Sequence, residues 1–368
     1  MSRLTKNNIL IYRLGSLGDT VMALPCFHKI KDSFPDADIT LLTNRPVMAK
    51  AAPLEAVLGQ NYFFNRVINY PVGTRSPRVL LDIILKIRRL KIDTVVNITP
   101  TRSRLAFKRD YLFFKAAGVK TLIGFDGANE DFEVAKDPLT GVNEWEAKRL
   151  ARRIDVLGSI PLEDNHYWDL KLTKDEKLVA DNCYKGQQQY TSTLVISLGT
   201  KNPANDWELD NWLILLENLS FALPGWQLLV IGAPNEKDAG DRCLLAWGKH
   251  SINLCGQTTP RESAAVLAKA NVFIGHDSGP MHLAACVGVP CVGIYSARNL
   301  PGQWFPRGNF NQILYNLPAC AGCGLEVCIT QQKKCILSIS VEQVQQAVLK
   351  VIDNKQKNIT HSVNPILS

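Results

Sequence analysis

The chain has 368 residues, enough for two α/β domains with separate cores, and its 46% hydrophobic and 21% charged content is ordinary for a globular protein. No apolar run is long enough to span a bilayer, and the charged first residues do not resemble a secretory signal peptide. The net charge of +8 comes without a basic tail or a recognisable nucleic-acid module, which argues against a nucleic-acid partner.

The positive charge is concentrated in the first half of the chain. Residues 1–170 carry 25 Lys and Arg against 19 Asp and Glu, whereas residues 171–368 carry 17 against 15. The basic residues cluster at 86–91, 102–109 and 148–153. These clusters are either solvated helix faces or a surface for an anionic partner, such as a phosphorylated substrate or membrane headgroups.

Strands alternate with helices in the first half, which predicts a doubly wound parallel sheet. In chain order we expect a strand at 8–12, a helix at 19–33, strands at 38–42 and 66–70, a helix at 77–90, strands at 94–98 and 123–125, and a helix at 144–157.

The second half repeats this alternation after a polar and aromatic crossing at 165–172. We expect a domain at 1–170, a second at 171–340, a helix at 341–353 and a flexible tail at 354–368. In chain order the second half should contain a strand at 193–197, a helix at 209–219, a strand at 227–231, a helix at 238–247, a strand at 253–255, a helix at 260–270, strands at 271–274 and 292–295, and the helix that begins at 341.

The segment Val272–Pro290, which reads VFIGHDSGPMHLAACVGVP, is the most informative part of the sequence. An apolar strand stops at Gly275, a polar turn follows, and a helix of small residues begins. Such a turn surrounds a concave mouth with backbone N–H groups that suit a phosphate. Asp277 and His282 add a carboxylate and an imidazole there, so we expect a phosphorylated small-molecule ligand.

The turn after the first strand reads Gly15-Ser16-Leu17-Gly18-Asp19. It is neither a GxGxxG dinucleotide motif nor a P-loop, because its glycines occupy the first and fourth positions and no Gly-Lys-Ser/Thr follows. Asp19 then falls at the start of a helix. It is either a capping carboxylate or a general base at the carboxyl ends of the strands, where open α/β sheets bind ligands.

A second polar turn, Gly199-Thr200-Lys201, follows the first strand of the second half. Lys201 is either an ordinary surface residue or the cation that pairs with a diphosphate. Its place just beyond a strand end, beside the phosphate turn, favours the second interpretation.

Four cysteines form a C-x2-C-x4-C-x6-C pattern: Cys320, Cys323, Cys328 and Cys335. Thiols at this density suggest zinc or iron, although the spacing is not that of a common zinc finger. A reducing cytoplasm argues against disulfides. A structural metal is therefore one hypothesis for these residues.

The sequence resembles glycosyltransferase family 9, the heptosyltransferases of lipopolysaccharide synthesis. The resemblance covers most of the chain and is carried by RLGSLGDTVMALP at 13–25, GTK at 199–201 with NDW at 205–207, and GHDSGPMHLAACVGVPCVGIY at 275–295. It implies the GT-B fold: two Rossmann-like, doubly wound domains that face a central cleft. The first would bind the acceptor and the second a nucleotide sugar, usually ADP-heptose.

The resemblance also implies roles for individual residues. Asp19 matches the catalytic base, with Gly18 and Arg102 on the acceptor side. Many members have a Lys just before the equivalent of Trp207, where this chain has Asn205 and Asp206, so Lys201 is expected to take that role. The cysteine pattern occurs in only part of the family. The residues expected to contact the donor are Thr200, Lys201, Glu236, Asp277, Ser278, Gly279 and His282.

The resemblance implies an inverting transfer of heptose, or a related sugar, from an ADP-sugar to a hydroxyl of a lipopolysaccharide core or related glycan. No cofactor is required, since Lys201 and the helix start at Ser278 would stabilise the leaving diphosphate. The enzyme would be cytoplasmic, with peripheral contact to the inner membrane. The alternatives are transfer to a protein or another glycan, epimerisation or hydrolysis of a nucleotide sugar, and an inactive binding or scaffold protein.

Overall fold

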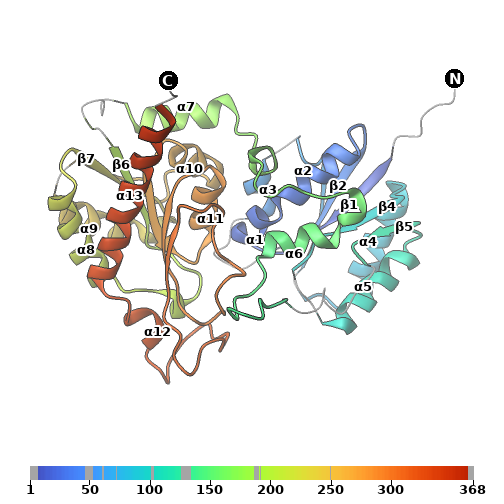
Figure 1. Ribbon diagram of the computed structural model, residues 1–368. Helices are drawn as coiled ribbons and strands as arrows, with labels where there is room; N and C mark the ends of the chain where they lie inside the picture. The colour runs from blue at the N-terminus through green and yellow to red at the C-terminus, as the bar shows by residue number, and fades with distance from the viewer. Residues whose placement is uncertain are drawn as a thin grey trace, which may run out of the picture. The chain divides into compact units, whose positions relative to one another are not determined.

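The computed structural model describes residues 7–45, 53–59, 62–71, 73–100, 103–125, 134–185, 190, 192–248 and 250–363, with no side-chain description for 356–363. Contacts divide the chain into two compact units, Met1–Lys171 and Leu172–Ser368, here called unit 1 and unit 2 (Figure 1). Each has its own hydrophobic core. Among the described residues, no helix is both long enough and apolar enough to cross a membrane.

Unit 1 is built on a parallel five-stranded sheet in the order β3-β2-β1-β4-β5. The central strand is apolar on both faces, and its Ile9, Leu10 and Ile11 are fully buried because helices cover both sides of a parallel sheet. The strands are β1 (Asn8–Tyr12), β2 (Asp38–Arg45), β3 (Arg66–Pro71), β4 (Thr94–Asn97) and β5 (Thr121–Ile123).

The helices of unit 1 differ from the expected ones in several places, including a short helix at Leu54–Leu58 that was not expected and a 3-10 turn at the end of the helix expected at 144–157. The helix expected at 19–33 is broken at Ala23, because Pro25 has no N–H to continue the helical hydrogen bonds. Helix α5 was not predicted, since its leucines face outward and blur the apolar periodicity. The elements are α1 (Leu17–Met22), α2 (Leu24–Ser33), α3 (Leu54–Leu58), α4 (Pro77–Arg89), α5 (Arg104–Ala116), α6 (Glu146–Arg153), and the 3-10 turns η2 (Asp155–Leu157) and η3 (Asn165–Trp168).

Unit 2 is built on a parallel six-stranded sheet in the order β11-β10-β9-β6-β7-β8. Its strands are β6 (Ser192–Ser197), β7 (Trp226–Val230), β8 (Ser251–Asn253), β9 (Val272–His276), β10 (Cys291–Ile294) and β11 (Gln312–Leu314). Its helices are α7 (Lys174–Cys183), α8 (Leu209–Ala222), α9 (Lys237–Trp247), α10 (Pro260–Leu267), α11 (Gly279–Cys286), α12 (Lys334–Leu337) and α13 (Val341–Val363), with 3-10 turns η4 (Pro203–Asn205) and η5 (Pro234–Glu236).

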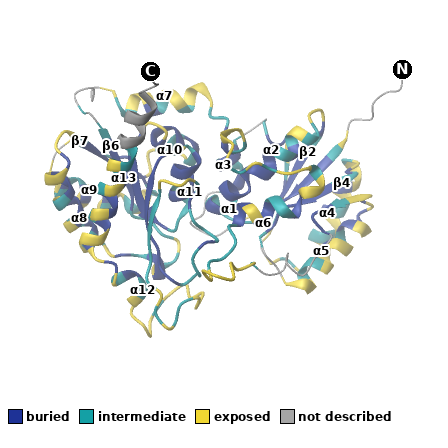
Figure 2. Ribbon diagram, in the orientation of Figure 1, coloured by how far each residue is buried: buried dark blue, intermediate teal, exposed yellow. Residues whose placement is uncertain are grey.

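Helix α13 packs against β9, β10, β11 and α8 through buried Val344, Val348 and Val351 (Figure 2). It continues to Val363 and does not end at Asp353 as expected. Residues 354–364 include neither Gly nor Pro, the two residues that most disfavour a helix. The sequence therefore contains no helix breaker directly after 353. The expected tail at 354–368 is therefore helical as far as Val363.

Candidate active site

In each sheet, consecutive strands of the chain are added toward one edge on one side of a certain point and toward the other edge on its other side. This point is here called the reversal point. In unit 1 this point lies between β1 and β4, and in unit 2 between β6 and β9. Loops that follow two such neighbouring strands leave in opposite directions and open a crevice at the carboxyl ends, which is where open α/β sheets bind ligands. Asp19 follows β1, Gly199–Lys201 follow β6, and Asp277 follows β9, so sequence-expected residues lie at both reversal points.

Asp19 is held at the start of α1 by the residue that caps this helix. The backbone N–H of Ser16 donates to Asp19 Oδ2 at 2.8 Å, and Ser16 Oγ donates to the same oxygen at 2.7 Å. Among the described residues, nothing donates a hydrogen bond to Oδ1. One oxygen of this partly exposed carboxylate is thus fixed, and the other is left to accept a proton.

Gly15 makes this geometry sterically allowed. Its φ is +133°, a conformation that favours glycine, and a Cβ built on it would lie 2.5 Å from Asp19 Cβ. Gly18, expected on the acceptor side, is buried within α1. Arg102, the other residue expected on that side, lies outside the described residues.

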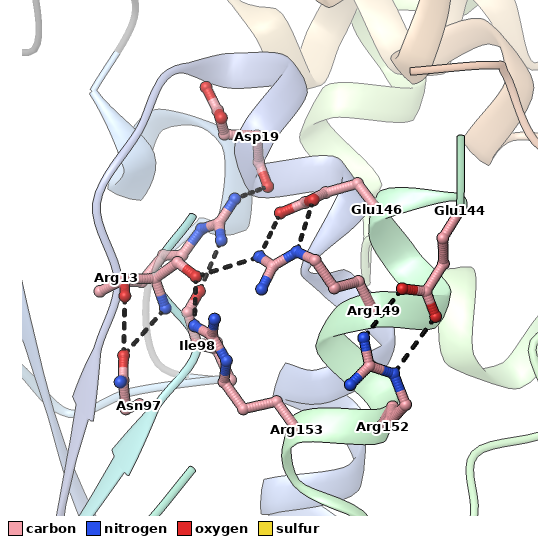
Figure 3. Close-up of polar contacts among 10 residues, drawn as sticks. Arg13, Asp19, Asn97, Ile98, Glu144, Glu146, Arg149, Arg152 and Arg153 are labelled. Atoms are coloured by element: carbon pink, nitrogen blue, oxygen red, sulfur yellow. Dashed lines mark hydrogen bonds and ion pairs between the residues drawn. The ribbon is translucent and has the colours of Figure 1, made fainter. Parts of the chain in front are cut away.

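A cluster of buried arginines lies beneath Asp19 (Figure 3). Arg13, fully buried at the end of β1, donates to the main-chain oxygens of Asp19 and Ile98. Burial lowers the pKa of Arg13, and the carboxylates of Asp19 and Glu146 oppose that effect. Arg13 therefore ties the backbone that carries Asp19 to the end of β4.

Helix α6 supplies the other arginines of this cluster. Arg149 forms a bidentate pair with Glu146, at 2.6 and 2.9 Å, and both side chains are buried. Arg149 and Arg153 also donate to the main-chain oxygen of Thr99, at 3.2 and 2.7 Å. The basic cluster at 148–153 is thus mostly internal, because the guanidinium groups of Arg149 and Arg153 donate to a carbonyl at the end of β4. Of the four basic residues in this cluster, only Lys148 is exposed.

In unit 2, Asn205 connects two loops of the site. It is buried, its Nδ2 donates to Asp277 O at 3.4 Å, and its Oδ1 accepts from Ser296 Oγ at 2.5 Å. This amide occupies the stretch in which the resemblance would place a lysine. It therefore supplies structure rather than charge and holds the turn after β9 against the loop after β10.

His276, the last residue of β9, also stabilises the turn that contains Asp277. It is fully buried, and its Nε2 accepts a hydrogen bond from the backbone N–H of Trp207 at 3.2 Å. Burial lowers the pKa of this imidazole to about 4, so it is neutral at physiological pH. A neutral ring suits an acceptor role, since a protonated one would have no lone pair for Trp207.

Glu236 lies against the loops after β6 and β7. A Cβ built on Gly199 would overlap Glu236 Oε1, and one built on Gly232 would overlap Oε2. The backbone N–H of Ala233 donates to Oε2 at 3.2 Å. Two glycines therefore allow this carboxylate to approach the strand ends, near the Gly199–Lys201 turn.

The turn after β9 retains hydrogen-bonding groups without protein partners. Ser278 Oγ and His282 Nδ1 are buried atoms with no hydrogen-bond partner among the described residues. His282 Nε2 lies 3.8 Å from Asp277 Oδ1. Gly279 is the first residue of α11, so its end of the helix presents backbone N–H groups beside these side chains.

Lys201 and Thr200 lie on the opposite side of the reversal point, after β6. Lys201 is exposed, and no ion pair or hydrogen bond of its side chain occurs within the described parts of the chain. Thr200 Oγ1 donates to Asn202 O at 3.2 Å. The ammonium group of Lys201 is therefore available to an anionic ligand.

A small pocket that is open to solvent adjoins Asp277. Tyr295, Trp304, Phe305 and Tyr315 supply aromatic walls, and Ser296 and Asn299 supply polar groups. Tyr295 is oriented by donating to Trp304 O at 3.0 Å. Aromatic faces beside a carboxylate suit a sugar ring, because they contact its C–H groups while the carboxylate accepts from its hydroxyls.

The four clustered cysteines lie between β11 and α13. In the part of the chain that the structure describes, which includes 320–335, no three Cys, His, Asp or Glu side chains are arranged to hold a metal ion. Cys323 is exposed, and Cys335 lies on α12, whereas the other three precede this helix. The structure therefore does not support a metal at these cysteines, and the structural metal stays a prediction.

Sequence reasoning missed several residues that position the site: Arg13, Ser16, Arg149, Asn205 and His276. Asn205 lies inside the NDW segment and His276 inside the GHDSG segment. Their place in these two segments was the only feature of the sequence that could have pointed to a role in the site. The buried role of Arg149 has no signal, because a basic residue in a basic run gives no indication of burial.

Two doubly wound parallel units with polar residues at their reversal points have the architecture of the GT-B fold. Residues 112–333, more than half of the chain, match the family model described as glycosyltransferase family 9 (heptosyltransferase). The chain belongs to this family.

Curated relatives agree with this assignment. The chain is 23% identical over 356 residues to lipooligosaccharide heptosyltransferase 2 of Campylobacter jejuni, covering 92% of this chain and 96% of that one. It is 23% identical over 295 residues to lipopolysaccharide heptosyltransferase 3 of Escherichia coli, covering 76% and 80%.

Solved structures share the fold. A family 9 glycosyltransferase from Veillonella parvula matches with a TM-score of 0.70 at 18% identity, covering 95% of this chain and 98% of that one. The E. coli heptosyltransferase WaaC, solved with ADP-2-deoxy-2-fluoro heptose, matches with a TM-score of 0.59 at 15% identity, covering 93% and 99%.

Proposed function

We propose that this chain transfers a heptose from ADP-heptose to a hydroxyl of a lipopolysaccharide core acceptor, with inversion at the anomeric carbon. The observation that carries the proposal is Asp19, whose carboxylate is held through one oxygen at the reversal point of unit 1. Relatives named for this activity, and the WaaC structure with an ADP-heptose analogue, support the choice of substrates.

Asp19 acts as the general base. A sugar hydroxyl is a poor nucleophile at neutral pH, so the carboxylate accepts its proton as the oxygen bonds to the anomeric carbon of the donor. The bond between that carbon and the diphosphate oxygen breaks, and ADP departs from the opposite face. One displacement of this kind inverts the configuration.

Unit 2 stabilises the leaving group. Negative charge grows on the diphosphate as the bond breaks, and Lys201 together with the N-terminus of α11 lies where such charge is favoured. Ser278 and His282 offer hydrogen bonds to the phosphates and the sugar, and the Thr200 hydroxyl does so by turning its proton from Asn202 O to a phosphate oxygen. Glu236 is assigned to the nucleoside, and Asp277 with its adjoining aromatic pocket to the heptose.

The acceptor implies the place of action. A core glycolipid is anchored in a membrane, and ADP-sugars are cytoplasmic metabolites, so we assign the chain to the cytoplasmic face of the inner membrane. No step of the proposed reaction uses a metal or another cofactor.

The test is an assay with ADP-heptose and a heptose-deficient core acceptor, read by mass spectrometry of the acceptor and by release of ADP. We expect one added heptose per acceptor and an equal amount of ADP. Transfer to protein only, or loss of ADP-heptose without an acceptor, would overturn the proposal; the latter would instead support a nucleotide-sugar hydrolase or epimerase. A product of retained anomeric configuration would refute the single displacement.

A further inference from the structure

Helices α4 and α5 expose leucines among basic residues on the surface of unit 1. On α4, Leu81 and Leu85 are 56% and 49% exposed and share a stripe with Arg78 and Arg89, because residues three or four positions apart lie on one side of a helix. The opposite side, with Ile83 and Ile87, is buried in the core of unit 1. Neither Leu81 nor Leu85 belongs to that core cluster.

Helix α5 repeats this arrangement. Leu105 and Leu112 are 81% and 55% exposed and lie among Arg104, Lys108 and Lys115, whereas Phe114 on the inner side is buried.

The two stripes lie on neighbouring helices. The Arg88 side chain at the end of α4 donates to the main-chain oxygens of Ala116 and Ala117, at 2.8 and 3.3 Å, at the end of α5. The crossovers β3 to β4 and β4 to β5 advance in the same direction across the sheet, so right-handed connections place both helices on one face. Exposed residues recur along both helices (Figure 2).

The charge of this surface is strongly positive. Helices α4 and α5 together contain eight Lys and Arg and only two acidic residues. Both acids are already paired, Asp82 with Lys86 and Asp110 with Arg109, each at 2.7 Å. The excess of six positive charges equals the whole excess of residues 1–170.

Single exposed leucines are common on proteins, but four leucines in two adjacent stripes, interleaved with long basic side chains, have the composition of an interfacial helix surface. Leucine enters the boundary between headgroups and acyl chains, and Lys and Arg extend to lipid phosphates. An anionic bilayer offers both the apolar layer and the negative charge.

We propose that this α4–α5 face docks the protein on an anionic membrane surface, with Leu81, Leu85, Leu105 and Leu112 inserted at the headgroup boundary and the basic residues bound to lipid phosphates. This deepens the proposed function, whose acceptor is an anionic glycolipid. It requires no catalysis, so it can be tested without the donor.

The test measures partition of the full chain onto sedimented phosphatidylcholine vesicles with and without phosphatidylglycerol. We expect binding to the mixed vesicles that weakens with added salt. Leu85→Ser with Leu112→Ser, and Lys108→Ser with Lys115→Ser, should each reduce this partition about tenfold or more. The matched control is Leu178→Ser with Leu245→Ser, because these leucines are 56% and 81% exposed on unit 2 and should have no effect.

Three outcomes would overturn the proposal: no preference of the wild type for anionic vesicles, an equal loss in the control, or loss in the lysine variant alone. The last would indicate a polyanionic partner, such as an acidic protein, in place of a bilayer.

Turnover on a deacylated, soluble acceptor separates the two proposals. We expect the leucine variant to keep that turnover while losing vesicle binding, whereas a wild type that binds vesicles but transfers no sugar would refute only the proposed function.

Discussion

At the scale of single residues, catalysis is proposed to depend on the carboxylate of Asp19, of which only one oxygen accepts hydrogen bonds from the described residues. Ser16 holds Asp19 Oδ2 through two hydrogen bonds, and Arg13 holds the Asp19 main chain. A residue that served only as a cap would also accept these hydrogen bonds, so the negative charge is what separates the two roles. Removing the negative charge would abolish catalysis by a general base but would leave a cap largely intact.

Replacing Asp19 by Asn separates catalysis from capping. The amide oxygen still accepts from Ser16, so we expect the free energy of unfolding to change by about 1 kcal/mol or less. A general base contributes on the order of a hundredfold to ten-thousandfold in rate, so kcat should fall by that factor while ADP affinity is kept. Steady-state kinetics and thermal unfolding measure both, with exposed Asp36→Asn as the control. If most of the turnover remains, Asp19 is only a cap.

The cation for the diphosphate is assigned to Lys201, because buried Asn205 supplies no charge in the stretch where the resemblance would place a lysine. Loss of a charge-assisted contact costs roughly 1.5–3 kcal/mol, so Lys201→Ala should weaken ADP binding about tenfold or more. Calorimetric titration tests this, with exposed Lys350→Ala on α13 as the control. Unchanged affinity in Lys201→Ala would assign the charge to another basic residue.

At the scale of elements, the turn after β9 depends on a buried imidazole. His276 accepts from the backbone of Trp207, and Trp207 Nε1 donates to Ile339 O at 2.8 Å. The end of β9, the 205–207 loop and the residues before α13 are therefore connected, and protonation of His276 would remove the first of these contacts.

This connection predicts a pH dependence of stability. The pKa of His276 is about 4 when folded and near 6.5 in an unfolded chain, so the unfolded state binds the proton first as the pH falls. The free energy of unfolding should hold above pH 6.5 and decrease between pH 6.5 and 4, by up to roughly 3 kcal/mol.

Denaturant unfolding at several pH values measures the effect, with His276→Gln as the variant because its amide oxygen can still accept from Trp207. Burial also lowers the pKa of His28 in unit 1, so the difference between wild type and variant isolates His276. Equal pH dependence in both proteins would contradict the assignment.

At the scale of the whole molecule, the chain contains two units with separate cores and separate groups of functional residues. The acceptor is assigned to unit 1 and the donor to unit 2, because Asp19 lies in the first and the Asp277 turn in the second. This division of roles is a proposal, and it can be tested with the nucleotide alone.

Hydrogen exchange with and without ADP tests the division. We expect slower exchange in peptides of unit 2 that contain residues 197–206, 232–236 and 276–282, because a ligand that binds the native state suppresses its opening. Peptides of α1 and β4 should change much less. Protection confined to unit 1 would reverse the assignment of donor and acceptor.

Much of the fold could be predicted from the sequence because parallel strands are short apolar runs that end in turn residues. The strand at 8–12 and the turn at Asp277 were placed correctly for this reason. Helix α5 and the break at Ala23 were not, since outward leucines hide the first and one proline decides the second. The sequence by itself thus determined the alternation of elements and which loops carry Asp19, Lys201 and Asp277.

Only the tertiary structure decided how those residues are supported. Arg149 and Arg153 belong to a basic run, yet they are buried because the carbonyl of Thr99 and the carboxylate of Glu146 face them. The four cysteines are close in sequence, yet the turns between them, all within the described residues, do not bring three thiols to one point. Spacing along the chain determines which residues are local neighbours, whereas burial and hydrogen bonding depend on packing against segments distant in sequence.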